Sequence, residues 1–137
     1  MILKILLWLN ISLLYAHELD AVRKREWKMM LFSDRVSDEA AYRIFTALHV
    51  PLFAAVFWFM EYRFRLLYWF VTVFGVFHFI LHSVFKKHIE NRMRNAFSRS
   101  IIVFIFLVSV ISLISGLALM TAGNVTVPAN VPPVTAP

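Results

Sequence analysis

Five residues that could bind a metal ion stand at or inside long apolar runs of this sequence. His17 and Glu18 come where the first apolar run ends, His49 lies within the second, and His78 and His82 lie within the third. A spacing of four residues places the last two imidazoles on one helix face, one turn apart. Neutral imidazoles and carboxylates are ligands that zinc, iron, manganese and copper accept. The pattern therefore predicts a divalent metal site built from facing helices.

These four histidines are expected at similar depths in a membrane. With helix ends near residues 22, 42 and 85, a rise of about 1.5 Å per residue places them roughly 5 to 11 Å below one boundary. Asp20 and Glu26 follow closely after Glu18 and would support the site by holding an imidazole through its other ring nitrogen. In a catalytic version, one coordination position stays open for water and a neighbouring carboxylate acts as the base.

A competing interpretation needs no metal. Histidines near helix ends also donate to backbone carbonyls or pair with carboxylates, and Glu18 and Asp20 could neutralise nearby arginines. The opening His-Glu-Leu-Asp lacks the second histidine of the HExxH zinc-peptidase motif. A proton relay through the same groups is a third interpretation.

The composition is that of a membrane protein. The 137 residues are 61% hydrophobic and only 16% charged, against roughly 25% charged in soluble domains. There is no cysteine, which excludes disulfides and thiolate metal ligands. The net charge of +6 comes from basic loops between apolar runs. Anionic lipid and topology control explain such loops, so no nucleic-acid partner is expected.

We predict an all-α polytopic membrane protein with four transmembrane helices in a single domain, residues 1–122. The spans are expected at about 2–22, 40–60, 66–85 and 100–122, each close to the 20 residues that cross a bilayer. A short interfacial amphipathic helix, anchored by Trp27, is expected between the first two spans. Ser37 is expected to cap the second span. Residues 123–137 form an extended, proline-rich tail.

Small residues and one proline predict how the spans pack. Pro51 removes a backbone donor inside the second span and favours a bend near His49. Gly75 would let another helix approach the third span closely. Ser109, Ser112 and Gly116 share one face of the fourth span and predict a packing seam.

Basic residues predict the orientation of the chain. Ten lie in the two loops that four spans place on one side, and three lie on the other: Arg23, Lys24, Arg25, Lys28, Arg35, Lys86, Lys87, Arg92, Arg94 and Arg99 against Lys4, Arg63 and Arg65. Short basic loops stay cytoplasmic, so both termini should face the non-cytoplasmic side. A cleaved signal peptide ending at Ala16 is the alternative for the first run, with Leu14 a poor match to its small-residue site.

The opening residues His17-Glu18-Leu19-Asp20, then Glu26-Trp27, together with His49-Val50-Pro51 and His78-x-x-x-His82, resemble a family of small, uncharacterised bacterial membrane proteins. The likeness covers roughly residues 5–85. It implies a bacterial inner-membrane protein in which the histidines and carboxylates act together as one unit. It implies no substrate.

The sequence favours one function, an accessory subunit, and leaves a metalloprotein as the alternative. The short loops, the apolar fourth span and the plain tail favour an accessory, stabilising or assembly subunit of a larger membrane complex, with other subunits, or copies of itself, as partners in the bilayer. The histidines and carboxylates favour a membrane-embedded metalloprotein, of hydrolase or oxidase type, with its site near the cytoplasmic leaflet. A transporter is the weaker interpretation, because four helices offer no continuous polar path.

Overall fold

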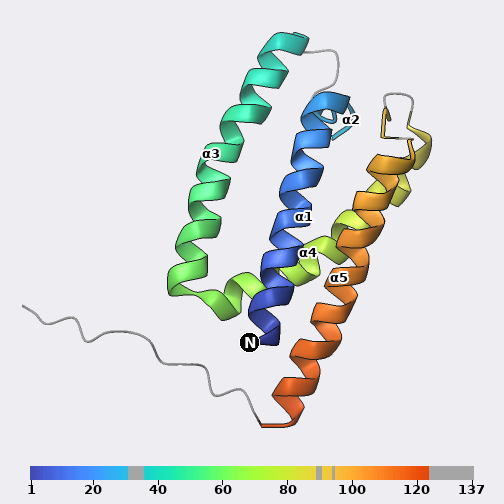
Figure 1. Ribbon diagram of the computed structural model, residues 1–137. Helices are drawn as coiled ribbons and strands as arrows, with labels where there is room; N and C mark the ends of the chain where they lie inside the picture. Colours follow the sequence, from blue (N-terminus) through green and yellow to red (C-terminus); the bar gives the residue numbers. More distant parts are fainter. Residues whose placement is uncertain (31–35, 89–90, 94, 124–137) are drawn as a thin grey trace, which may run out of the picture.

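The computed structural model describes residues 1–30, 36–88, 91–93 and 95–123, and all secondary structure in these residues is helical. The elements follow one another along the chain as shown in Figure 1: α1 (Ile2–Lys24), α2 (Trp27–Met30), α3 (Asp38–Tyr62), α4 (Phe64–Val84), the 3-10 turn η1 (Phe85–Lys87) and α5 (Ala96–Thr121).

Four of these helical segments are long and apolar enough to cross a membrane: Ile2–Lys24, Asp38–Tyr62, Phe64–Lys87 and Ala96–Thr121. Each exceeds the roughly 20 residues that a bilayer requires. The predicted fold class, an all-α chain with four transmembrane helices, is therefore confirmed.

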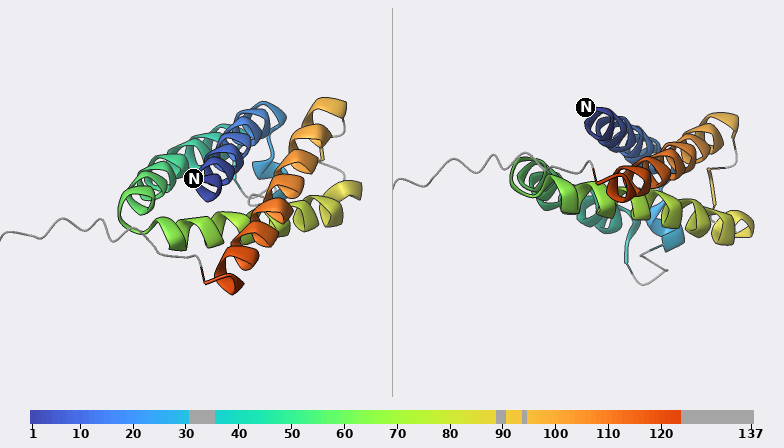
Figure 2. Two further views of the ribbon diagram at one scale, coloured as in Figure 1. Left: turned by 60° about the horizontal axis from the view of Figure 1, so that its bottom comes forward. Right: turned by 90° about the horizontal axis from the view of Figure 1, so that it is seen from below.

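Helices α1, α4 and α5 form the packed centre of the molecule, and α3 lies to one side of it. In Figure 1, α4 passes obliquely behind α1, and α5 runs along its right; the two further views in Figure 2 show the same crossing. The apolar core comes from these three helices: Leu6, Leu7, Ile11, Leu67, Tyr68, Val71 and Val108. Within α3 only Ala41 is buried. The C-terminal ends of α1 and α4 lie at the same end of the molecule, opposite the N-terminus.

A seam of small and polar side chains holds α5 against α1 and α4. The side-chain amide of Asn10 donates to the Ser109 hydroxyl at 2.9 Å, and that hydroxyl lies 3.2 Å from Asn10 Oδ1. A Cβ atom on Gly75 would collide with Ser109. Ser109, Ser112 and Gly116 are all buried, as the predicted seam requires.

Side-chain caps explain where α3 and α5 begin. The Ser37 hydroxyl accepts from the Ala40 N–H at 3.3 Å, so the predicted cap is confirmed. Helix α5 begins at Ala96, four residues before the predicted start, because Asn95 caps it by accepting from the Ser98 N–H at 2.9 Å. Both caps satisfy a donor that the first turn of a helix leaves free.

The segment between α1 and α3 differs from the predicted interfacial helix. The helix α2 has only four residues, and residues 31–35 lie outside the described part of the chain. Trp27 is 3% exposed and packs on Tyr42 and Phe45, with its indole N–H donating to Asp38 at 3.2 Å. It fastens α2 to α3 instead of facing outward. The predicted tail falls almost wholly on residues 124–137, which are also outside the described residues.

Candidate metal centre

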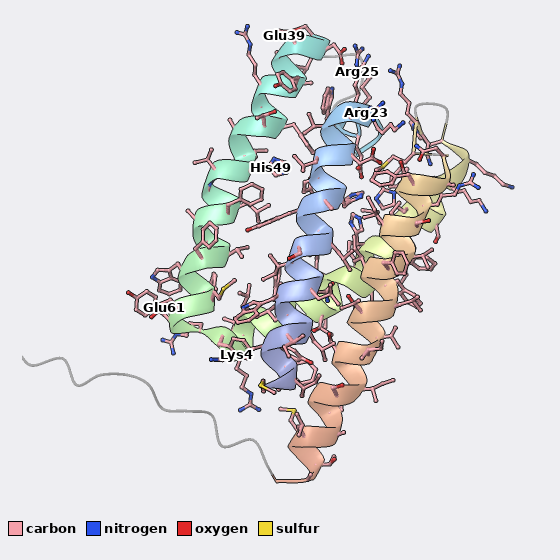
Figure 3. The ribbon with its side chains drawn as sticks, viewed as in Figure 1. Lys4, Arg23, Arg25, Glu39, His49 and Glu61 are labelled. Atoms are coloured by element: carbon pink, nitrogen blue, oxygen red, sulfur yellow. The ribbon has the colours of Figure 1, made fainter. Side chains whose placement is uncertain are left out.

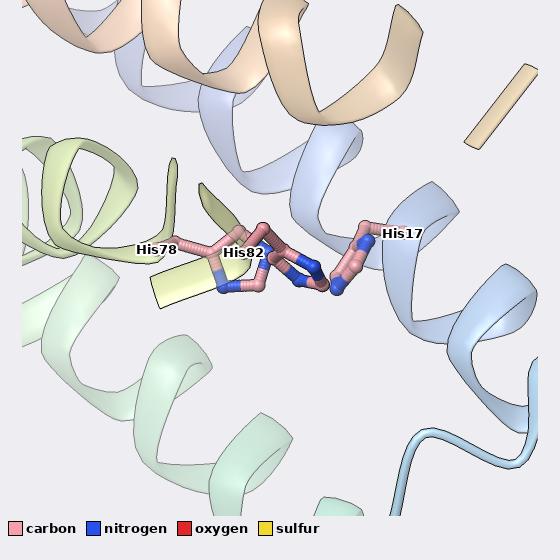
Figure 4. A group of neighbouring side chains, drawn as sticks. All are labelled: His17, His78 and His82. Carbon is pink, nitrogen blue, oxygen red and sulfur yellow. The ribbon is translucent and has the colours of Figure 1, made fainter. Parts of the chain in front are cut away.

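Three of the four predicted histidines meet between α1 and α4. His17 comes from α1, and His78 and His82 come from successive turns of α4 (Figure 4). Each offers a ring nitrogen, and these three nitrogens lie within 4.8 Å of one another. Ring centroids are 4.3 Å apart for His17 and His78, and 4.5 Å apart for His78 and His82. Three imidazoles at this spacing could ligate a single metal ion.

The three imidazoles are buried and incompletely hydrogen-bonded. His17, His78 and His82 are 1%, 5% and 7% exposed. His82 Nε2 lies 3.2 Å from Glu26 Oε1, but His17 Nδ1 and His78 Nε2 have no hydrogen-bond partner among the described residues. Buried polar atoms are nearly always paired, so each of these atoms calls for a proton donor, a proton acceptor or a metal.

Glu26 closes the cluster from the chain segment after α1. Arg25 takes a left-handed conformation with φ 58°, and the Glu26 N–H then donates back to the Ala21 carbonyl at 3.0 Å. This reversal, of a kind that commonly ends helices, returns the chain toward α1. The Glu26 carboxylate reaches within 3.4 Å of His17 Nε2 and 3.2 Å of His82 Nε2.

The charge of Glu26 fits a site that attracts cations. Burial acts to raise the pKa of the Glu26 carboxyl, but the close imidazoles of His17 and His82 outweigh it and lower the pKa to about 2. The side chain is only 4% exposed. A buried carboxylate that stays ionised needs a positive partner beside it.

Glu18 and His49 were predicted as ligands, but the structure pairs them with each other outside the cluster. His49 Nε2 lies 2.9 Å from Glu18 Oε2, and His49 Nδ1 lies 2.7 Å from the Phe45 carbonyl oxygen. Adjacent residues of a helix point about 100° apart, so His17 and Glu18 cannot both face α4. His17 therefore joins the cluster, and Glu18 turns toward α3, where Figure 3 shows His49 directed at α1.

Asp20 also lies apart from the histidines. It is 7% exposed and accepts a hydrogen bond from the Ser98 hydroxyl, in the first turn of α5. An acidic side chain at that position favours the helix dipole of α5. Of the two carboxylates predicted to support the site, the structure brings Glu26 to the imidazoles and pairs Asp20 with Ser98 of α5 instead.

An open cavity of about 220 Å³ adjoins the cluster on the side of α5. His82 is one of its walls, and Lys86 and Arg99 lie at its polar part. Sequence reasoning missed this cavity. The apolar runs predict the helices, but they carry no signal for the crossing of α4 and α5 that leaves the space between them.

Most of the chain matches one family model, which covers residues 3–119 and is described as a family of unknown function, DUF6713. The chain belongs to DUF6713. The matched region of this DUF6713 protein contains every candidate ligand, from His17 to His82. It also contains every residue that lines the cavity. No curated protein and no solved structure matches the chain. The match to DUF6713 agrees with the predicted membership of an uncharacterised family. The detailed motif and the bacterial origin of that family stay predictions.

Proposed function

We propose that this DUF6713 member is a membrane metalloprotein that binds one divalent transition-metal ion through His17, His78 and His82, with Glu26 beside it. One observation carries the proposal: three buried imidazoles from two helices offer nitrogens within 4.8 Å of one another. Zinc, iron, manganese and copper all accept such ligands.

The unpaired ring nitrogens favour a metal over a purely structural cluster. A structural set of histidines is stabilised when its nitrogens donate to or accept from neighbours, yet His17 Nδ1 and His78 Nε2 have no partner among the residues described. Burying an unpaired polar group costs about 1–3 kcal/mol. A metal ion bound by these nitrogens would remove that cost at both positions.

Glu26 suits either of two roles in this site. As a fourth ligand it would neutralise one positive charge of the ion, and its ionised state favours that role. As a neighbour it would fix the orientation of His17 and His82 through their ring nitrogens, a support that metal-binding imidazoles commonly have. A bound ion with an open position would supply Lewis acidity and an activated water.

Elemental analysis tests the proposal. The full chain is purified in mild detergent without chelator, and the metal content of the wild type is compared with that of His78→Ala/His82→Ala. We expect close to one metal ion per chain in the wild type and its loss in the double variant. Wild-type protein that binds no stoichiometric zinc, iron, manganese or copper when these are supplied would overturn the proposal.

His49→Ala is the matched control. It removes the same side chain from a spanning helix, but its partners are Glu18 and the Phe45 carbonyl. We expect this variant to keep the full metal content. Equal loss from His49→Ala and from the double variant would attribute the effect to general damage of the fold and contradict the assigned ligand set.

A subunit role in a larger membrane complex is the second candidate, and α3 favours it. Only Ala41 of α3 is buried, and its outer face presents Leu48, Val50 and Phe57, each more than half exposed. Either lipid or another membrane protein would cover this face. Gentle solubilisation followed by size analysis distinguishes them, since a subunit retains its partner and an independent metalloprotein migrates alone. We place the protein in a bacterial inner membrane with the metal site near the cytoplasmic side.

A further inference from the structure

We propose that the cavity between the ends of α4 and α5 binds the phosphate headgroup of an anionic membrane lipid and holds it against His82. This inference rests on the proposed function, because it names the class of molecule that would meet the metal. The binding itself depends on residues outside the metal cluster. The cavity walls come from α4, the following loop and α5: Phe79, His82, Ser83, Lys86, Asn91, Met93, Arg99, Ile102 and Val103.

The charge of the cavity selects an anion. Lys86 and Arg99 face it from two different elements, and among the described residues no acidic side chain lines it. Among the described residues, no carboxylate lies within ion-pair distance of Lys86 or Arg99. Arginine and lysine together suit a phosphate, because the guanidinium donates through two N–H groups and the ammonium adds a point charge.

Hydrogen bonds hold part of the cavity wall in place. Asn91 is 9% exposed, and its amide donates to the Phe85 carbonyl at 3.0 Å while its side-chain oxygen accepts from the Met93 N–H at 2.9 Å. These bonds hold Asn91 and Met93 against the end of α4. His82 is 7% exposed and lines the cavity, with its Nε2 held 3.2 Å from Glu26 Oε1.

The other walls favour a lipid over free phosphate. Phe79, Ile102 and Val103 form the apolar part, on the sides of α4 and α5 that continue into the membrane-spanning segments. Val103 is 43% exposed, so the cavity is open along an apolar surface. A headgroup between Lys86 and Arg99 would thus leave its acyl chains along α4 and α5. The cavity volume of about 220 Å³ is sufficient for a phosphate with its glycerol.

Calorimetric titration of the metal-loaded full chain in detergent tests this inference. The probes are a short-chain phosphatidylglycerol, the matching phosphatidylcholine, and inorganic phosphate. We expect phosphatidylglycerol to bind, the zwitterionic lipid to bind at least about tenfold more weakly, and inorganic phosphate to compete poorly. Lys86→Gln/Arg99→Gln should weaken phosphatidylglycerol binding by about tenfold or more, because it removes both of the cations that line the cavity and would bond the phosphate directly.

Lys24→Gln/Lys87→Gln is the matched control, since it removes two positive charges at the same end of the molecule from residues that do not line the cavity. It should leave affinity nearly unchanged. Equal weakening by both double variants, or equal binding of the two lipids, would overturn the proposed site. Full competition by inorganic phosphate at matched concentration would overturn the lipid assignment.

Metal content, measured on the same samples, separates the two proposals. Both double variants should keep the metal of the wild type, because neither removes a candidate ligand. Loss of lipid selectivity in fully metal-loaded protein counts against the lipid site alone. Selective lipid binding by protein that never takes up metal counts against the metalloprotein proposal alone.

Discussion

His17 and Glu18 are neighbours in the chain, yet each serves a different helix contact. His17 turns toward His78 and His82 of α4, and Glu18 turns toward His49 of α3. The carboxylate that reaches the imidazoles is therefore Glu26, nine positions after His17 and beyond the end of α1. Which residues form the site therefore depends on the direction of each side chain. Depth along a helix does not determine that direction.

Replacement of Glu26 tests its place beside the imidazoles. Glu26→Gln keeps the size of the side chain but removes its charge, so we expect metal affinity to fall about 10–100-fold. Competition with a chromogenic chelator measures that affinity. Glu18→Gln is the control, because Glu18 pairs with His49 away from the cluster, and it should leave affinity unchanged. A stronger effect from Glu18→Gln than from Glu26→Gln would contradict the arrangement.

The lowered pKa of Glu26 predicts how stability depends on pH in chelator-treated protein. The carboxyl has an ordinary pKa of 4.5, and it is lowered to about 2 beside His17 and His82. An acid with a lowered pKa in the folded state stabilises the protein above its ordinary pKa, and this contribution is lost as the pH falls toward the lowered value. We expect Glu26→Gln to have a lower thermal midpoint than the wild type near neutral pH.

The difference should shrink between pH 4.5 and pH 2 as Glu26 takes up its proton. Thermal unfolding followed by circular dichroism in one detergent, at several pH values, measures it. A gap between the two proteins that stays constant down to pH 2 would mean that the Glu26 charge does not provide the stabilisation.

Among the elements, the contact between α4 and α5 depends on the missing side chain of Gly75. A Cβ atom there would meet the side chains of Ser109 and Ile105. Gly75→Ala should therefore destabilise the protein by about 1–3 kcal/mol, as overpacking of a tight interface does. In the background of Ser109→Ala the same change should cost less, because the hydroxyl that it would strike is gone. Thermal unfolding of the four proteins in detergent tests this, and equal costs in both backgrounds would refute the contact.

The elements were largely predictable because their signals are local. Apolar runs give the four spans, Ser37 gives the start of α3, and the small residues of α5 give its packing seam. The approach of Glu26 to the imidazoles was not predictable from the sequence. It depends on a chain reversal at Arg25, which takes a left-handed conformation where glycine or asparagine would be the usual signal. His49 was misplaced for a related reason: depth along a helix says nothing about the face that α3 presents to α1.

At the scale of the whole molecule, the candidate metal centre joins the packed helices at one end. His17 belongs to α1, His78 and His82 belong to α4, and Asp20 ties the same part of α1 to Ser98 of α5. A bound ion would cross-link α1 and α4 without involving α3. Because an ion that binds only the folded state raises its stability, metal and folding should be coupled here.

The position of the charges predicts which side of the membrane this end faces. Arg23 and Arg25 lie at the end that carries the loops after α1 and α4, and Lys4 and Glu61 lie at the other end (Figure 3). Short loops rich in lysine and arginine are retained in the cytoplasm. The candidate metal centre and the proposed lipid site lie at this end of the molecule and should then be near the cytoplasmic leaflet.

Single cysteines measure this orientation directly, because the native chain contains none. Tyr62→Cys places a thiol at the end of α3 nearest the turn to α4, and Lys87→Cys places one in η1 at the opposite end; both positions are exposed. In intact bacterial cells expressing each variant, a membrane-impermeant maleimide should label Tyr62→Cys, while Lys87→Cys should react only after lysis. The reverse labelling would put the basic loops outside and move both proposed sites to the non-cytoplasmic leaflet. The distribution of charge would then have failed to set the topology, and the lipids reaching His82 would be those of the outer leaflet.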